Sequence, residues 1–447
     1  MTTVPILTIN SGSSSLKASL FRADGTRQDF RYEHIGQGFP HDHRYAFDAL
    51  LRNLGSDQPA AVGHRLVHGG DVTTPARLID DTERARLQQL VALAPLHLPG
   101  NLLGVDLCRA HFAAPQIACF DTAFHATLPP LAQRLPIASG LGLRRYGFHG
   151  INYAHIAQRL PTLLGDAASG NIVVAHLGNG ASLCLLQNLQ SMDTTMGYTP
   201  AGGIPMGTRS GDLDPGVMLT LAERYPPAEL NDLVYQRMGL IALSEGESSD
   251  MAQLLASDSA AAQFAVEYFC QQVRGAIGAL AAKAGGIDAL VFTAGIGEHS
   301  SLIRSMICDP LDFLGFKLDH HANHDHETFL SAQGSKPVLC VPADTTRPAA
   351  MRMITHKIST PQPRTRPVTA RSSPCSPVRL IRRRAMWPNT IAGMVASGPI
   401  TACASPKAKL AIAYPLVLAM RAAGPAGSAC TGRSVPGRSV TSSSRSA

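Results

Sequence analysis

The chain contains two patterns of strand, glycine turn and returning strand, separated by about 166 residues, as measured from Gly12 to Gly178. The first pattern spans residues 4–10, 16–21 and 28–34, and the second spans residues 171–177, 181–186 and 191–194. In each, an apolar strand ends at a glycine-containing turn before the chain returns. Segments with helical periodicity lie between and after them, at 81–93, 217–224 and 261–284. The spacing predicts an α/β chain with two similar halves.

Three glycine turns follow apolar strands, and each is a candidate for binding phosphate. They are residues 10–17, residues 178–180 and residues 294–298. Glycine lets backbone N–H groups approach an anion closely. The first turn is not a P-loop, because Leu16 stands where that pattern has glycine. The alternatives are a Ser/Gly hairpin for the first turn and a type I′ hairpin turn for the second, whereas three such turns together favour one nucleotide site.

Two arginines, Arg65 and Arg209, each lie among glycines, in residues 63–70 and 206–212. A guanidinium group there can reach a carboxylate or a phosphoryl group with a planar fork of donors. The alternative is a structural salt bridge at each position. Two similar settings favour an anionic substrate.

Asp121 and His149 are the candidate groups for chemistry. Asp121 directly follows the apolar strand 116–120, so it lies at the carboxyl end of that strand, where open α/β sheets bind ligands. There it could orient a nucleophile or Mg²⁺. His149 could donate a hydrogen bond to a transferring phosphoryl group, or it could be a satisfied core histidine. The histidine-rich segment 320–326 resembles a metal site, but its polar context favours a solvated loop.

The acidic residues are distributed unevenly. The formal charge of +7 comes from 39 Lys and Arg against 32 Asp and Glu, yet every acid lies at or before Asp344. Residues 345–447 hold 16 basic residues, which leaves a charge of −9 on residues 1–344. We interpret the acid-free tail as disordered, or as an out-of-frame or fused segment. An arginine-rich arm that binds nucleic acid or membrane, centred on residues 379–384, is the competing hypothesis.

The cysteines and the apolar runs indicate a cytoplasmic protein. The nine cysteines are scattered without a C-x-x-C pair, which favours a reducing compartment. The N-terminus reads as a strand and not as a signal peptide, and the longest apolar run of the tail, residues 410–420, is too short to span a bilayer. We expect no membrane and no nucleic-acid partner.

Nine ordered segments give the chain a specific resemblance to the acetate/propionate kinase family. They cover about residues 4–344 and are INSGSSSLK (9–17), GHRLVHGG (63–70), APLHLPGNLLG (94–104), FDTAFHATLP (120–129), RRYGFHG (144–150), HLGNGAS (176–182), DTTMGYTPAGGIPMGTRSGDLDP (193–215), SSDM (248–251) and VFTAGIGEHS (291–300). The resemblance implies a duplicated actin-like, ribonuclease-H-like two-domain kinase fold with an ATP cleft between the domains. It also implies an acetate kinase, which reversibly transfers the ATP γ-phosphoryl group to acetate to give acetyl phosphate and ADP, with Mg²⁺ or Mn²⁺, as a homodimer.

The expected domains are residues 1–121, an N-terminal actin-like domain, and residues 122–346, a C-terminal nucleotide-binding domain. Part of residues 347–365 is a candidate to complete the first domain. The basic tail covers residues 361–447.

The resemblance also implies roles for individual residues. The catalytic residues are Asp121, His149 and Arg209, and the metal is bound with the help of Asn10. The acyl substrate is bound by Arg65, Val67, Leu96, Phe148 and Pro200. The nucleotide is bound by Lys17, His176, Leu177, Gly178, Asn179, Gly180, Asp250, Met251, Ala252, Ala294, Gly295, Ile296, Gly297 and Glu298.

Two alternatives stay open. One is a propionate kinase, because an apolar pocket discriminates one methylene by only about 1–3 kcal/mol. The other is a catalytically impaired nucleotide-binding homologue. The family pattern has a pair of glutamates after position 344, one of which helps to bind Mg²⁺, whereas this chain has Thr345, Thr346 and Arg347.

Overall fold

The computed structural model describes residues 4–12, 15–33, 35, 40–95 and 97–344. Leu96, the segment 347–365 and the tail 361–447 lie outside the described residues. The predictions made for them therefore stay predictions.

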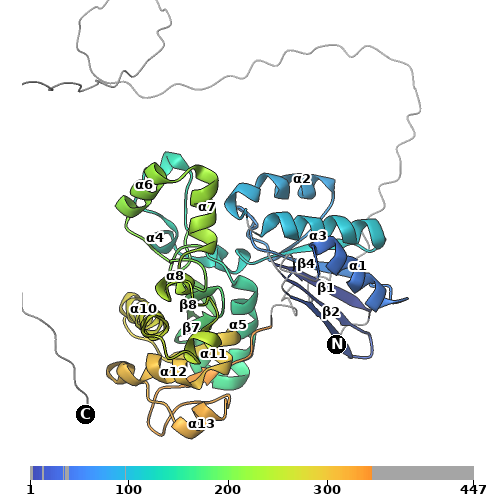
Figure 1. Ribbon diagram of the computed structural model, residues 1–447. Helices are drawn as coiled ribbons and strands as arrows, with labels where there is room; N and C mark the ends of the chain where they lie inside the picture. Colours follow the sequence, from blue (N-terminus) through green and yellow to red (C-terminus); the bar gives the residue numbers. More distant parts are fainter. Residues whose placement is uncertain (1–3, 13–14, 34, 36–39, 96, 345–447) are drawn as a thin grey trace, which may run out of the picture. The chain divides into compact units, whose positions relative to one another are not determined.

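The first sheet has six strands in the order β3-β2-β1-β4-β6-β5. Figure 1 shows its strands β1, β2 and β4 beside the helices α1 and α3. The strands are β1 (Ile6–Ser11), β2 (Leu16–Phe21), β3 (Arg27–Tyr32), β4 (Ala61–Leu66), β5 (Ala76–Leu78) and β6 (Gln116–Phe120). Strands β1, β2 and β3 form an antiparallel meander, and β1, β4 and β6 run parallel to one another. Strand β5 closes the far edge by antiparallel pairing with β6.

The second sheet repeats this arrangement with the order β11-β10-β7-β8-β9. Its strands are β7 (Asn171–Leu177), β8 (Ala181–Gln187), β9 (Gln190–Thr194), β10 (Ala289–Thr293) and β11 (Val338–Cys340). Here too, a meander of β7, β8 and β9 is followed by β10 and β11, which run parallel to β7. The predicted duplication is therefore present in the topology.

Helices connect the strands and cover the sheets. The longer ones are α1 (His43–Leu54), α2 (Asp81–Gln89), α3 (Leu98–His111), α5 (Gly150–Leu164), α6 (Pro215–Arg224), α7 (Pro227–Gln236), α10 (Ala260–Ala284) and α12 (Ser301–Cys308). The short α-helices are α4 (Pro130–Gln133), α8 (Leu240–Leu243), α9 (Met251–Leu255), α11 (Ala294–His299) and α13 (His320–His324). The 3₁₀ segments are η1 (Val91–Leu93), η2 (Ala123–Thr127), η3 (Ser139–Leu141), η4 (Gly165–Ser169) and η5 (Asp309–Leu314). None of the described helices is both long and apolar enough to span a bilayer.

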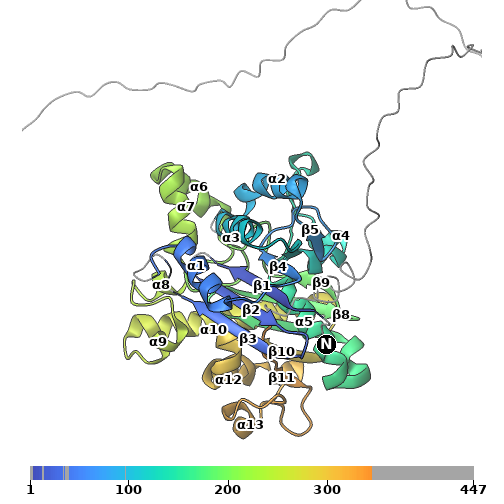
Figure 2. The same ribbon diagram turned by 90° about the vertical axis from the view of Figure 1, so that its right-hand side faces the viewer.

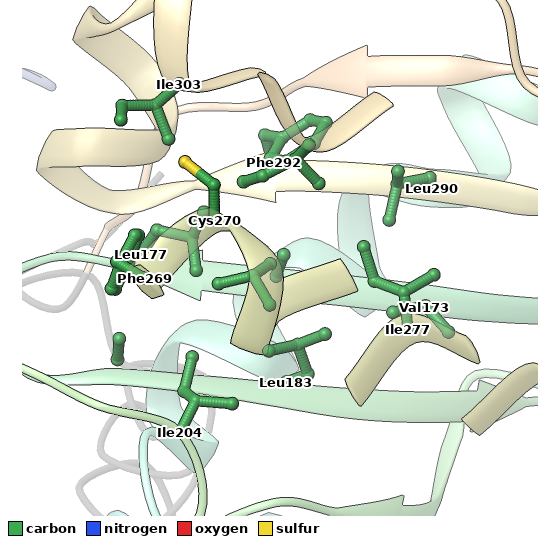
Figure 3. Close-up of a cluster of buried hydrophobic side chains, with 14 of the residues drawn as sticks. Val173, Leu177, Leu183, Ile204, Phe269, Cys270, Ile277, Leu290, Phe292 and Ile303 are labelled. Atoms are coloured by element: carbon green, nitrogen blue, oxygen red, sulfur yellow. The ribbon is translucent and has the colours of Figure 1, made fainter. Parts of the chain in front are cut away.

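The second sheet is buried on both faces. Along β7, Val173 and Leu177 join Phe269 and Ile277 of α10 in one apolar cluster (Figure 3). The alternate residues of the same strand, such as Val174, pack with α5 in another cluster. Because side chains alternate between faces along a strand, a continuous apolar run such as residues 172–175 is what a sheet between two helices requires.

The first sheet is covered by α1 and α3 on one face (Figure 2). Leu7 and Leu20 from the meander pack there with Phe47 of α1 and Cys108 of α3. On the opposite face, Ile6 and Ile117 belong to one buried cluster with Ile151 of α5. Helix α5 therefore packs against strands of both sheets.

Two sequence expectations need correction. The predicted helix 81–93 is two segments, α2 and η1, interrupted at Leu90. The proposed type I′ turn at residues 178–180 is wrong, because that turn requires positive φ at its central residues and none of these three has it. Three residues instead join the paired positions Leu177 and Ala181.

The last described residue contacts the first sheet. After β11 of the second sheet, Oδ2 of Asp344 lies 3.6 Å from Nη1 of Arg27, which is in β3. The chain thus returns to the first sheet at the point where its acidic residues end.

Candidate active site

The ends of three adjacent strands bring Asn10, Arg65 and Asp121 together. Strands β1, β4 and β6 run parallel, so their carboxyl ends share one edge of the sheet. Arg65 donates from Nε (2.9 Å) and Nη2 (2.5 Å) to Oδ2 of Asp121. It also donates from Nη1 to Oδ1 of Asn10, at 3.0 Å. Since a guanidinium group has five N–H donors, two remain for a ligand.

His149 and Arg209 flank Gly180. A Cβ atom placed on Gly180 would lie 2.9 Å from Nη2 of Arg209 and 3.3 Å from Nε2 of His149. Arg209 is also fixed from its other side, because Nη1 donates to the carbonyl of Pro200 at 2.7 Å. The missing side chain of Gly180 therefore leaves space between a guanidinium group and an imidazole.

His149 is held in an unusual conformation at the N-cap of α5. Its φ is 58° and its ψ is 17°, in the left-handed region that few non-glycine residues adopt. The ring stacks on that of His176, with centroids 4.0 Å apart, and its Nδ1 contacts Oγ of Ser182 at 2.9 Å. Such an outlier persists only where the surroundings hold it, and it favours a functional role.

Both stacked histidines are neutral at physiological pH. Loss of hydration lowers the pKa of His149 well below its usual value of 6.5, and the nearby His176, Arg65 and Arg209 lower it further. The same effect, with Arg65 second, lowers the pKa of His176 to about 3. Loss of hydration also lowers the pKa of Arg209 to about 10, so its guanidinium stays charged. The site thus combines cationic arginines with uncharged donors.

Val67 and Phe148, expected to line the acyl pocket, lie in one buried apolar cluster with Leu98 and Met206. Pro200 is buried too and reaches the site through its bond from Arg209. Leu96 lies outside the described residues, so its part in the pocket stays a prediction.

The second and third glycine turns lie side by side. A Cβ atom on Gly178 would be 3.7 Å from Cβ of Ala294 and 3.9 Å from the amide nitrogen of Gly295. Asn179 accepts a backbone hydrogen bond from Gly207, two residues before Arg209. Asn179 and Gly180 of the second turn thus lie next to the loop that carries Arg209, and Gly178 lies next to the third turn.

The segment 294–298, expected as a glycine turn, forms part of the short helix α11. Ile296 is partly exposed and Gly297 is buried, and Oε1 of Glu298 accepts from the amide of Ala343 at 2.8 Å. Asp250 caps α9 by accepting from the amides of Ala252 and Gln253. Met251 is buried in the large apolar cluster, so of residues 250–252 only Asp250 and Ala252 are exposed.

Lys17 lies on β2 directly opposite Asn10, but its amine is engaged elsewhere. Its Nζ lies 3.3 Å from Oε1 of Glu33 in an exposed ion pair. A phosphate would have to draw Lys17 from Glu33, which costs little because exposed pairs contribute only about 0–1 kcal/mol.

His97 is a site residue that the sequence reasoning missed. Loss of hydration lowers its pKa to about 3, and Arg209 and Arg65 contribute to the shift, so the ring lies near both arginines. Its Nδ1 is buried without a hydrogen-bond partner. The available signal was its position between two prolines in PLHLP, residues 95–99.

The side chains available to a divalent metal are few. Within the described ranges, no group of three or more His, Cys, Asp or Glu residues could hold an ion, and residues 320–326 are largely exposed. One carboxylate, from Asp121, and one amide oxygen, from Asn10, lie at the same strand edge. Because Mg²⁺ is usually held by one or two carboxylates together with substrate phosphates, this donor set fits an ion that the nucleotide shares.

Known proteins share this sequence and fold. The Acetokinase family model matches residues 41–349. An acetate kinase of Nitrobacter hamburgensis is 41% identical over 76% of this chain and 93% of its own length. A propionate kinase of Escherichia fergusonii is 40% identical over 65% of this chain and 76% of its own. The crystal structure of a propionate kinase from Francisella tularensis superimposes with a TM-score of 0.70 at 30% identity, covering 76% of this chain and 96% of that one.

The duplicated sheets and the match to solved kinase structures define an actin-like, two-domain phosphotransferase. The chain belongs to the acetokinase family. The predicted family and fold class are confirmed, and membership implies ATP as co-substrate together with a divalent metal.

Proposed function

We propose that the protein reversibly transfers the γ-phosphoryl group of ATP to acetate, giving acetyl phosphate and ADP, with Mg²⁺ as the metal. The observation that carries this proposal is the cluster of Asn10, Arg65 and Asp121 close to His149 and Arg209, in a chain of the acetokinase family. In-line phosphoryl transfer depends mainly on positioning and on neutralising charge, and this cluster supplies both.

The acetate oxygen attacks the γ-phosphorus, and the bond from that phosphorus to the β,γ-bridging oxygen breaks. The electron pair of the broken bond leaves with ADP. The two uncommitted donors of Arg65 bind the acetate carboxylate, while Asp121 and Asn10 hold the guanidinium in place. Arg209 and the neutral His149 donate to the phosphoryl oxygens from either side of Gly180. Mg²⁺ bound with ATP would neutralise charge on the phosphates.

The expected nucleotide contacts come from four parts of the chain. The turn of Gly178, Asn179 and Gly180 and the helix α11 supply backbone N–H groups, and Asp250 and Ala252 add exposed groups. Lys17 reaches the phosphates when it leaves Glu33.

The residues expected to bind the acyl group, which are Val67, Leu96, Phe148 and Pro200, are apolar and suit a small substrate. Propionate is the second candidate substrate, since both acetate kinases and propionate kinases are among the relatives. One extra methylene changes binding by only about 1–3 kcal/mol in an apolar pocket. We therefore expect turnover with both acids.

A hydroxamate assay for acyl phosphate tests the reaction with acetate and with propionate, each with and without Mg²⁺. Metal-dependent product with acetate is the expected result. Nucleotide binding measured by calorimetry without any product would contradict the proposal and support the impaired homologue that lacks the metal-binding glutamate after position 344.

We also propose that the protein is a cytoplasmic homodimer. Helix α6 has no buried residue although it carries Val217 and Leu219, which are 45% and 68% exposed. The six cysteines of the described residues are all buried and free, as a reducing compartment permits. Sedimentation of the full chain tests the dimer, and a single species of about 47 kDa would contradict it.

A further inference from the structure

We propose that Ser182 and Tyr153 are positioning residues for His149, because they determine which of its ring nitrogens carries the proton. Ser182 donates to Nδ1 of His149, and Tyr153 holds the Ser182 hydroxyl in that role. The proton of the neutral ring then resides on Nε2, which faces Arg209 across Gly180. This inference rests on the proposed phosphoryl transfer.

The three groups form a continuous chain of hydrogen bonds. Oγ of Ser182 lies 2.9 Å from Nδ1 of His149 and 2.5 Å from Oη of Tyr153. Tyr153 lies one helical turn after His149 on α5, and Ser182 lies on β8. Both supporting residues are fully buried, so no bulk water competes for these bonds.

Counting protons decides the direction of these bonds. The two hydroxyl groups have one proton each, and the neutral imidazole has one. If the ring proton is on Nε2, Tyr153 donates to Ser182 and Ser182 donates to Nδ1, so both hydroxyl protons are satisfied. If the ring proton is on Nδ1, three protons share two contacts, and one buried hydroxyl proton has no acceptor.

The hydrogen bonds of the described residues give Oη of Tyr153 and Oγ of Ser182 no other partner. A buried donor without an acceptor disfavours a state by roughly tenfold or more. The Nε2–H tautomer of His149 is therefore dominant.

The tautomer matters because of what Nε2 faces. A neutral ring with its proton on Nε2 donates to an anionic phosphoryl oxygen, whereas the other tautomer would direct a lone pair at that oxygen. Loss of hydration and the neighbouring cations keep the pKa of His149 low. The ring therefore stays neutral, and its two tautomers remain distinct. Two residues that never touch the substrate thus determine whether His149 donates.

The test uses Ser182→Ala and Tyr153→Phe in the full chain. Long-range ¹H–¹⁵N spectra of histidine-labelled protein without substrate report the tautomer of His149, whose signals are assigned by their loss in His149→Asn. We expect Nε2–H in the wild type, a clear rise of the Nδ1–H form in Ser182→Ala, and a smaller rise in Tyr153→Phe, where Ser182 still donates. The kcat should fall about tenfold or more in Ser182→Ala and a fewfold in Tyr153→Phe, with KM for ATP within about twofold.

Ser191→Ala is the matched control. Ser191 lies on the neighbouring strand β9. Its buried hydroxyl contacts Nδ1 of another buried histidine, His125, at 2.8 Å. This variant should lose similar thermal stability but keep the His149 tautomer and a kcat within about twofold.

An Nδ1–H tautomer in the wild type would overturn the inference, even if Ser182→Ala failed to fold. It would also be overturned if Ser182→Ala kept both the tautomer and the kcat. Because the spectra need no turnover, a tautomer that shifts in a chain without kinase activity would leave the positioning role intact and reject the proposed function.

Discussion

Arg65 donates two hydrogen bonds to the same oxygen of Asp121, one from Nε and one from Nη2. The Asp121 side chain is only 2% exposed, whereas that of Arg65 is 18% exposed. The carboxylate thus lies behind the guanidinium group, and the outer side of Arg65 can meet a ligand. In the proposed reaction, Asp121 therefore fixes a cation and is assigned no proton transfer.

Replacing Asp121 with Asn tests whether the carboxylate of Asp121 orients Arg65 for catalysis. The amide removes the charge that anchors Arg65, and loss of one partner of a buried pair should cost at least about 2 kcal/mol of unfolding free energy. We expect kcat in the hydroxamate assay to fall at least about 100-fold, with a lower melting temperature. Asp81→Asn is the control, since Asp81 pairs with Arg109 while 93% exposed and should lose neither activity nor stability. An active Asp121→Asn variant would contradict the assignment.

Gly180→Ala should block the space between Arg209 and His149. The new Cβ would lie 2.9 Å from Nη2 of Arg209, closer than real Cβ contacts allow, so the guanidinium must shift. We expect kcat to fall about tenfold or more while the melting temperature changes little. Gly140→Ala is the control, because Gly140 is exposed and outside the proposed site, no described atom beyond its chain neighbours lies within 4 Å of a Cβ placed there, and its φ is not positive. Equal activities in the two variants would reject the role of this space.

Arg209→Lys should retain the positive charge but lose the two separate donor directions of the guanidinium group. The guanidinium group donates to Pro200 with Nη1 and faces Gly180 with Nη2, and an ammonium group cannot do both. Arginines that stabilise phosphoryl transfer contribute about 10³-fold or more to kcat. We expect a loss of that order with KM for acetate within about threefold, and partial recovery of Arg209→Ala activity by added guanidinium. Wild-type turnover by Arg209→Lys would remove Arg209 from the site.

Buried histidines should make the fold sensitive to mild acid. Loss of hydration lowers the pKa of His64 and of His125 to about 4, from an ordinary value of 6.5. Between pH 6.5 and 4, these two histidines bind protons in the unfolded chain but stay neutral in the folded chain. Stability is therefore complete above about pH 7 and is lost as the pH falls, by up to about 1.4 kcal/mol per pH unit for each histidine. Urea unfolding at pH 5, 6, 7 and 8 measures how the unfolding free energy depends on pH. An equal unfolding free energy at pH 5 and 7 would contradict it, and His64→Gln should reduce the slope.

The sequence was sufficient for elements that depend on local patterning. Residues 16–21, 116–120 and 171–177 are predicted as strands and have those bounds, because short runs rich in apolar residues and bounded by turn-forming residues are typical of buried strands. The type of the turn at 178–180 could not be predicted, since glycine identities alone do not define φ.

The assembly of the site could not be derived from spacing. Asn10, Arg65 and Asp121 meet because β1, β4 and β6 pair in parallel across segments of more than 50 residues, which is a long-range property of the chain. Their joint placement was accessible only through the family resemblance. Tyr153 carried no signal at all, because an aromatic residue on the buried face of a helix has the pattern of ordinary core packing.

The left-handed backbone of His149 allows its side chain to be removed without adding backbone strain. Glycine adopts φ near 58° without strain, whereas alanine does not, so His149→Gly removes the imidazole while relieving the backbone. Such a variant should be inactive yet at least as stable as His149→Ala, and it leaves a ring-sized void beside His176. The His149→Gly variant would then bind free imidazole in this void, and added imidazole would restore its kinase activity.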